Sequence, residues 1–177
     1  RNIRVKVMQT LYTFTSLETG EKSVEPQKIL QEHFDQTRSL LVYLIWFVTE
    51  VARYAETDAH QKASKHLPTA LDLNVNTKIA GNDLLWKMLG DEALKAEISS
   101  QKPSLIADNE LIRKIYLKLK DITEYKSYIS NSSREKAEET RIIELILNDL
   151  MLDNEDFVSH IEDNFSCRRI IVNPLMR

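Results

Sequence analysis

Residues 40–48, LLVYLIWFV, form the most apolar stretch of the chain and lie between Arg38 and Glu50. These nine residues are less than half of the roughly 20 that a membrane-spanning helix needs. A helix that is apolar on nearly all sides must be surrounded by other elements. We therefore predict that a long helix, from Pro26 to about Asp58, is the central post of a helical bundle and does not cross a membrane.

Apolar side chains follow helical spacing along one stripe of this predicted helix: Ile29, Leu40, Leu44, Phe47, Val51 and Ala55. The composition extends the prediction, because Leu, Ile, Glu and Lys are abundant whereas the 177 residues include only three Gly and four Pro. We predict an all-α fold with essentially no sheet, a bundle of about six to eight helices around the one long central helix.

Further helices are predicted on both sides of the central one. In the first, from Arg1 to about Leu17, the apolar residues recur at steps of four, four and three and are expected to face inward: Ile3, Val7, Leu11 and Phe14. Residues 61–82 lose helical periodicity, so we expect a loop insertion there. We predict one helical domain over residues 1–167, and an irregular tail or fragment end over residues 168–177.

Two helix starts can be predicted after the loop. Asp108 is a candidate N-cap, and Ser132 with Glu135 has the spacing of a capping box, in which two side chains bond reciprocal backbone donors. The helix after Glu135 is expected to bury an apolar side made of Ile142, Ile143, Ile146 and Leu150.

The charge balance limits the classes of partner. With 24 Lys and Arg against 27 Asp and Glu, the net charge is -3, so the chain cannot coat nucleic acid through bulk positive charge. Any contact with RNA must be local. Cys167 is the single cysteine and no secretory signal pattern opens the chain, which together predict a cytoplasmic protein.

No pattern of catalytic or metal-binding residues emerges. His33 and Asp35 are two positions apart in a predicted helix, so their side chains diverge around its axis. His60 and His66 lack the spacing of four residues that a helical metal site needs. We predict no enzyme activity, no cofactor and no metal site.

The first segment carries the candidate site. Arg1, Arg4 and Lys6 are cationic, and no acidic residue precedes Glu18. Cations at a helix N-terminus oppose the macrodipole and cost a few tenths of a kcal/mol to about 1 kcal/mol, so a role other than stability is indicated. A solvated basic face is the alternative interpretation.

Helical geometry gathers part of this segment on one side. At about 100° per residue, Arg1, Gln9 and Tyr12 project within an arc of roughly 80°, with Arg4 at its border. Guanidinium groups bind phosphates, an amide can read a base edge, and a phenol ring can stack on an unpaired base. We predict single-stranded RNA binding by Arg1, Arg4, Lys6, Gln9 and Tyr12.

The pattern Arg1-x-x-Arg4-x-x-x-x-Gln9-x-Leu11-Tyr12 resembles the arginine-rich opening of the NusB transcription antitermination family. Later segments resemble the longer NusB variants of Bacteroidetes-type bacteria: Tyr43-Leu44-Ile45, Arg53-Tyr54-Ala55, Lys65-His66-Leu67-Pro68-Thr69 and Asp72-Leu73-Asn74-x-Asn76-Thr77-Lys78. The resemblance covers the N-terminal half of the family, whose second helical half has no counterpart here.

The resemblance implies an antitermination factor that regulates transcription. The opening helix of that family binds the boxA element of ribosomal RNA leaders together with NusE, a small-subunit ribosomal protein, in a complex on RNA polymerase. That role is carried over onto Arg1, Arg4, Gln9 and Tyr12. Whether the chain forms a homodimer is left open.

Two alternatives stay open. A similar helical domain precedes the catalytic domain of certain ribosomal-RNA cytosine methyltransferases, which would make this chain an RNA-binding accessory domain. The other alternative is a helical protein-interaction module without RNA binding, which the acidic net charge favours.

Overall fold

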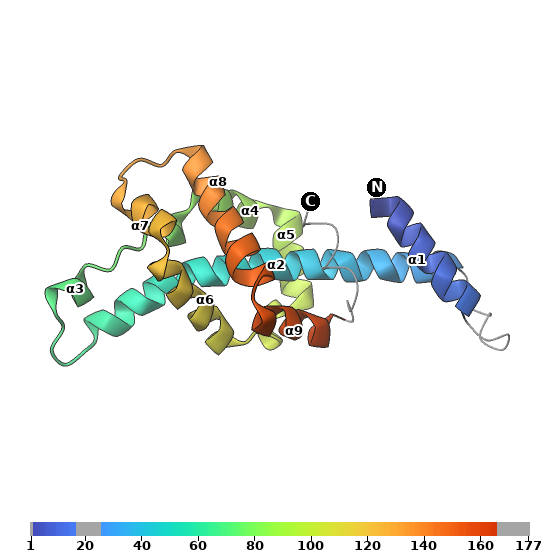
Figure 1. Cartoon of the computed structure of the whole chain (residues 1–177), viewed down its shortest axis with the longest axis horizontal. Helices are drawn as coiled ribbons and strands as arrows, with labels where there is room; N and C mark the ends of the chain where they lie inside the picture. Colours follow the sequence, from blue (N-terminus) through green and yellow to red (C-terminus); the bar gives the residue numbers. More distant parts are fainter. Residues whose placement is uncertain (1, 17–25, 166–177) are drawn as a thin grey trace. The chain divides into compact units, whose positions relative to one another are not determined.

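The computed structural model describes residues 2–16 and 26–165, and every regular element in these two ranges is helical (Figure 1). The predicted all-α class is confirmed. The elements in chain order are α1 (Asn2–Ser16), α2 (Pro26–Ala63), α3 (Ala70–Leu73), η1 (Lys78–Gly81), α4 (Asp83–Gly90), α5 (Glu92–Gln101), η2 (Pro103–Leu105), α6 (Asn109–Asp121), α7 (Thr123–Ser130), α8 (Lys136–Leu145), η3 (Ile146–Leu152) and α9 (Glu155–Asn164).

The chain divides into two compact units, residues 1–42 and 43–177, and α2 belongs to both. Arg1, Cys167 and the predicted tail 168–177 lie outside the described residues. No helix among the residues that are described is both long and apolar enough to cross a membrane.

In the first unit, α1 contacts α2 through a polar pair. The side chains of Lys6 and Thr10 are buried, and Thr10 Oγ1 donates to the Lys6 carbonyl at 2.9 Å and lies 3.2 Å from His33 Nδ1 on α2. The prediction that Val7 and Leu11 face inward is wrong, since they are 38% and 49% exposed. The buried side of α1 is therefore turned by about 100°, one residue's rotation, from the side that periodicity predicted.

In the second unit, α2 is surrounded by other helices, as its composition predicted. The Phe47 ring packs on Phe157 of α9 with centroids 4.8 Å apart, and the Tyr54 ring lies 5.2 Å from that of Tyr116 on α6. Of the six stripe residues, only Leu44 is not fully buried. The helix continues to Ala63 instead of ending at about Asp58.

The helix starts after the loop differ in outcome. The Asp108 carboxylate accepts from the backbone N–H groups of Glu110 and Leu111, so this N-cap is confirmed. The capping box at Ser132 and Glu135 is wrong, because α8 begins at Lys136 and no side chain bonds its N-terminus.

The predicted apolar side of this helix is buried: Ile142, Ile143, Ile146 and Leu150. Its continuation, η3, is a π-helix in which the Asp153 N–H donates to the Asn148 carbonyl five residues back, at 3.2 Å. Such wide turns are rare and occur often at functional sites.

Candidate functional site

The exposed side of α1 carries three residues at intervals of four: Arg4, Met8 and Tyr12. Met8 is 67% exposed and Tyr12 is 73% exposed, and Arg4 is exposed as well. Residues four apart on a helix lie one above the other, so these three side chains form one row. We call them the α1 row.

The other residues predicted for the site are placed differently. Gln9 is half-buried at the edge of this exposed side, and Lys6 is buried on the side that contacts α2. Arg1 lies outside the described residues. The structure therefore brings Arg4 and Tyr12 onto one surface and does not bring Lys6 to it.

Met8 was missed by the sequence reasoning, which assigned the exposed side from charged, amide and aromatic residues. Its spacing of four from both Arg4 and Tyr12 was a usable signal. A row of guanidinium, thioether and phenol groups offers a cation for a phosphate and a flat, polarisable surface on which a base can stack.

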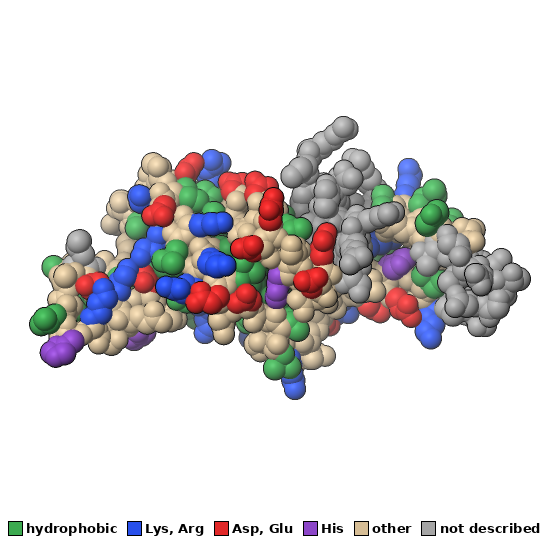
Figure 2. Space-filling view, turned by 60° about the horizontal axis from the view of Figure 1, so that its bottom comes forward, with side chains coloured by type: hydrophobic (Ala, Val, Ile, Leu, Met, Phe, Trp, Pro, Cys, Tyr) green, Lys and Arg blue, Asp and Glu red, His purple; other side chains and the backbone are tan. Residues whose placement is uncertain are grey.

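Many cations outside α1 lie close to acidic side chains. Figure 2 shows Lys and Arg side chains lying among Asp and Glu side chains over the face that it presents. Several of these cations form ion pairs: Arg53 with Glu50, Lys65 with Asp72, Lys95 with Glu92, Arg113 with Glu110, and Lys114 with Asp156.

In the second unit, the Asp58 carboxylate accepts hydrogen bonds from two lysines. Asp58 Oδ2 accepts from Lys62 Nζ at 2.9 Å and from Lys120 Nζ at 3.0 Å, and the Asp58 side chain is only 12% exposed. Burial opposes its ionisation, but the two lysine hydrogen bonds outweigh that effect and hold the pKa of Asp58 below its usual value. This cluster fastens the end of α2 to α6.

We expect Asp58→Asn to lower the free energy of unfolding by about 1–2 kcal/mol at pH 7, because it removes charge-assisted bonds to Lys62 and Lys120. Because the pKa of Asp58 is lower in the folded than in the unfolded chain, its carboxylate stabilises the fold when the pH is above the unfolded-state pKa near 3.9. This stabilisation is lost as the pH falls through the folded-state pKa. The difference between Asp58→Asn and the parent should therefore shrink in acid. Urea unfolding at pH 7 and pH 3 measures this difference in the free energy of unfolding. An equal difference at both pH values would contradict a stabilising role of the ionised Asp58 carboxylate.

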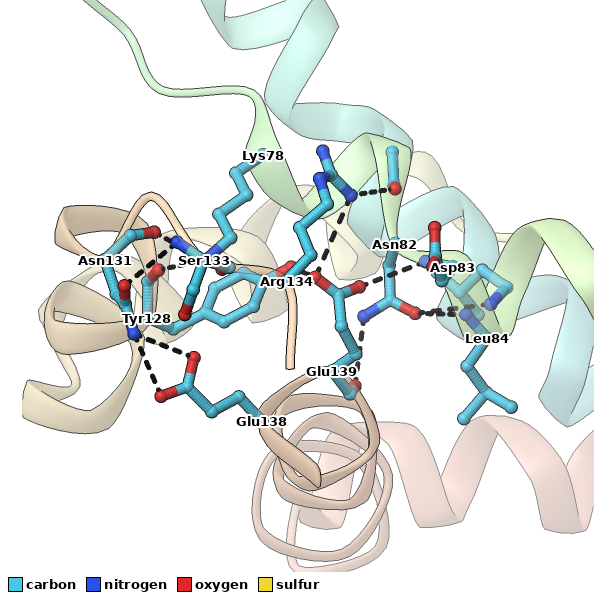
Figure 3. Close-up of polar contacts among 12 residues, drawn as sticks. Lys78, Asn82, Asp83, Leu84, Tyr128, Asn131, Ser133, Arg134, Glu138 and Glu139 are labelled. Carbon is cyan, nitrogen blue, oxygen red and sulfur yellow. Dashed lines mark hydrogen bonds and ion pairs between the residues drawn. The ribbon is translucent and has the colours of Figure 1, made fainter. Parts of the chain in front are cut away.

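A second buried carboxylate joins three helices of the second unit (Figure 3). The Glu139 side chain on α8 is 1% exposed. Its carboxylate accepts from the Asp83 N–H at the start of α4 and from the Tyr128 hydroxyl of α7, both at 3.0 Å, and pairs with Arg134 at 3.8 Å. Asn82 Nδ2 donates to the Glu139 carbonyl at 3.0 Å. We call this set the Glu139 network.

Lys78 extends the same region by closing the end of α7. Its Nζ donates to the carbonyls of Tyr128, Asn131 and Ser133 at 2.7–2.9 Å and lies 4.1 Å from the centre of the Tyr128 ring (Figure 3). The bond to Tyr128 satisfies a carbonyl in the last turn of α7, and the other two fix the C-cap and the loop that follows it. The contacts of Lys78 indicate a structural role.

Two of the four histidines, His33 and His160, make side-chain contacts within their own units. His160 Nε2 lies 2.7 Å from the Tyr43 hydroxyl, and burial raises the pKa of Tyr43 above its usual value. Asp35 accepts from Gln31 at 3.1 Å instead of approaching His33. In residues 2–16 and 26–165 no three His, Cys, Asp or Glu side chains gather as they would around a metal ion.

Comparison with protein families, with characterised proteins and with solved structures finds no match to this chain.

Proposed function

We propose that this chain is an RNA-binding transcription antitermination factor of the NusB type, with the α1 row as its RNA contact. The observation that carries the proposal is the joint exposure of Arg4 and Tyr12 on one side of α1, because these are two of the residues on which the resemblance to that family depends. The partners it implies are boxA-type leader RNA, NusE and the antitermination complex on RNA polymerase.

The chemistry of the row suits an unpaired strand. A base can stack on the Tyr12 ring, and Arg4, two helical turns away, can bind a phosphate of the same strand. Met8 between them is 67% exposed and supplies an apolar, polarisable surface. This arrangement provides a local contact, as a chain of net charge -3 requires.

The test of the cationic contact is Arg4→Gln. We expect it to weaken binding of a single-stranded boxA RNA by about 1 kcal/mol, roughly fivefold, and to reduce the slope of log K against log salt concentration by about 0.7. Filter binding over a salt series measures both quantities. The matched control is Arg113→Gln on α6, an exposed arginine that pairs with Glu110.

Arg113→Gln should leave both affinity and slope unchanged. If Arg4→Gln and Arg113→Gln behaved alike at every salt concentration, α1 would not be the contact helix. A failure of the parent to bind any boxA RNA would remove the proposal altogether.

A protein-interaction module without RNA binding is the second candidate, and one observation favours it. Val5, Val7 and Leu11 on α1 are 48%, 38% and 49% exposed, which gives this helix an unusual apolar surface. Co-purification of NusE with a chain that binds no RNA would favour this candidate over the first.

A further inference from the structure

A groove lies between α7 and α8 in the second unit. Its volume is about 680 Å³, and it continues into a smaller cavity of about 200 Å³ beside η3. Both cavities share Glu124, Arg141 and Leu145, so they form one continuous surface. We call it the α7–α8 groove.

The two walls of the groove have the same spacing. On the α7 side the lining residues include Glu124, Ser127, Tyr128 and Asn131, and on α8 they are Glu138, Arg141, Ile142 and Leu145. Each set occupies positions i, i+3, i+4 and i+7, which is one face of a helix over two turns. Each wall of the groove is therefore about 10 Å long, two helical turns, a length along which a third helix can pack.

The floor of the groove is apolar. Tyr128, Ile142 and Leu145 are only 5%, 3% and 8% exposed, and they line the hollow. Apolar side chains inserted from outside would contact these edges and displace water from them.

The rim of the groove is acidic. Arg141 is the one cation among the residues that line the groove and its extension. The lining includes four carboxylates: Glu124, Glu138, Glu144 and Asp149. The Glu138 carboxylate also accepts from Asn131 Nδ2 at 3.1 Å, which fixes it at the mouth. Asp149 lies on the π-helix η3, whose wider turn changes the direction of side chains from that of a regular α8 continuation.

From these observations we infer that the α7–α8 groove binds a Lys- and Arg-rich amphipathic helix of a partner protein. Such a helix would place Leu, Ile or Met side chains on the apolar floor and basic side chains against the acidic rim. RNA does not fit this site, because the rim carboxylates repel phosphates. The inference goes beyond the RNA contact proposed for α1 and does not depend on it.

A defined probe tests the inference with the whole chain. The probe is a fluorescein-labelled peptide of about 14 residues, roughly four helical turns, with Leu at positions i, i+3, i+4 and i+7 and Lys elsewhere. Fluorescence anisotropy should show saturable binding that weakens as salt rises. The same peptide with Glu in place of every Lys should not bind.

Two groove variants and two matched controls locate the binding. The triple variant Glu124→Gln, Glu144→Gln and Asp149→Asn should weaken the Lys peptide by roughly tenfold, since each exposed charge pair contributes modestly. Ser127→Trp should abolish binding, because an indole at this exposed α7 position fills the groove. The first control is a triple variant that removes the same number of carboxylates elsewhere: Glu92→Gln, Glu110→Gln and Asp163→Asn. The second control, Ser99→Trp, adds an indole on α5.

Both controls should bind the peptide like the parent, and circular dichroism should show all four variants equally helical. Equal affinity of parent and Ser127→Trp would overturn the inference, as would a parent that does not bind the Lys peptide. A third outcome is that the chain does not bind the peptide but forms a dimer, and that Ser127→Trp abolishes the dimer. The occupant of the groove would then be a second copy of the chain, and the inference would be wrong.

Discussion

Glu139→Ala is expected to lower the free energy of unfolding by about 3–5 kcal/mol. The substitution removes one buried carboxylate that accepts from the Asp83 N–H and the Tyr128 hydroxyl and faces Arg134. Each buried donor left without an acceptor costs about 1–3 kcal/mol, and the missing side chain adds a cavity. Because the partners belong to α4 and α7, both helices should loosen from α8.

Urea denaturation followed by circular dichroism measures this effect, and the neighbouring residue supplies the control. Glu138 bonds Asn131 at the surface, so Glu138→Ala should cost less than about 1 kcal/mol. Glu139→Gln, which keeps the shape and one acceptor oxygen, should fall between the two. A Glu139→Ala variant as stable as Glu138→Ala would mean that the Glu139 network does not hold these helices together.

Tyr12→Ala is expected to weaken binding of single-stranded boxA RNA by about 1–3 kcal/mol, or roughly 5- to 150-fold. The reason is the loss of a stacking surface for a base, since Tyr12 is 73% exposed on the outer side of α1. The same exposure predicts little change in the free energy of unfolding. Filter binding at one fixed salt concentration measures the affinity.

Tyr12→Phe separates stacking from hydrogen bonding. A phenylalanine ring stacks as well as tyrosine, so Tyr12→Phe should bind close to the parent, whereas Tyr12→Ala should not. The slope of affinity against salt should stay unchanged in both variants, because no phosphate contact is lost. Tyr12→Ala binding like the parent would exclude the α1 row as a stacking platform.

The two proposed surfaces are chemically opposite and can be tested separately. The α1 row is cationic and aromatic, whereas four carboxylates line the α7–α8 groove. A chain of net charge -3 that carries both surfaces uses its cations and its anions at different places. Variants of one surface should leave binding at the other unchanged.

The sequence by itself determined the helical class, the long central helix and most of its buried stripe. Phe47, Val51 and Ala55 are fully buried as predicted, and Asp108 caps α6. These features depend on local quantities, namely apolar periodicity within one helix and a side chain bonding N–H groups two or three residues ahead. Such quantities can be read from neighbouring residues alone.

Only the tertiary structure decided which way α1 faces and where α8 begins. Thr10 reaches His33, 23 residues away, and this pairing buries Lys6 in place of the aliphatic Val7 and Leu11. Ser133, within the predicted capping box, accepts a hydrogen bond at its carbonyl from Lys78, 55 residues away. The Glu139 network likewise exists only once α8 packs on α4, 56 residues away, and the α7–α8 groove depends on how two consecutive helices pack. Apolar periodicity predicts that a segment is helical and which side is apolar on average. The side that is buried and the residue at which the helix begins depend on contacts with residues distant in the sequence, which local sequence does not specify.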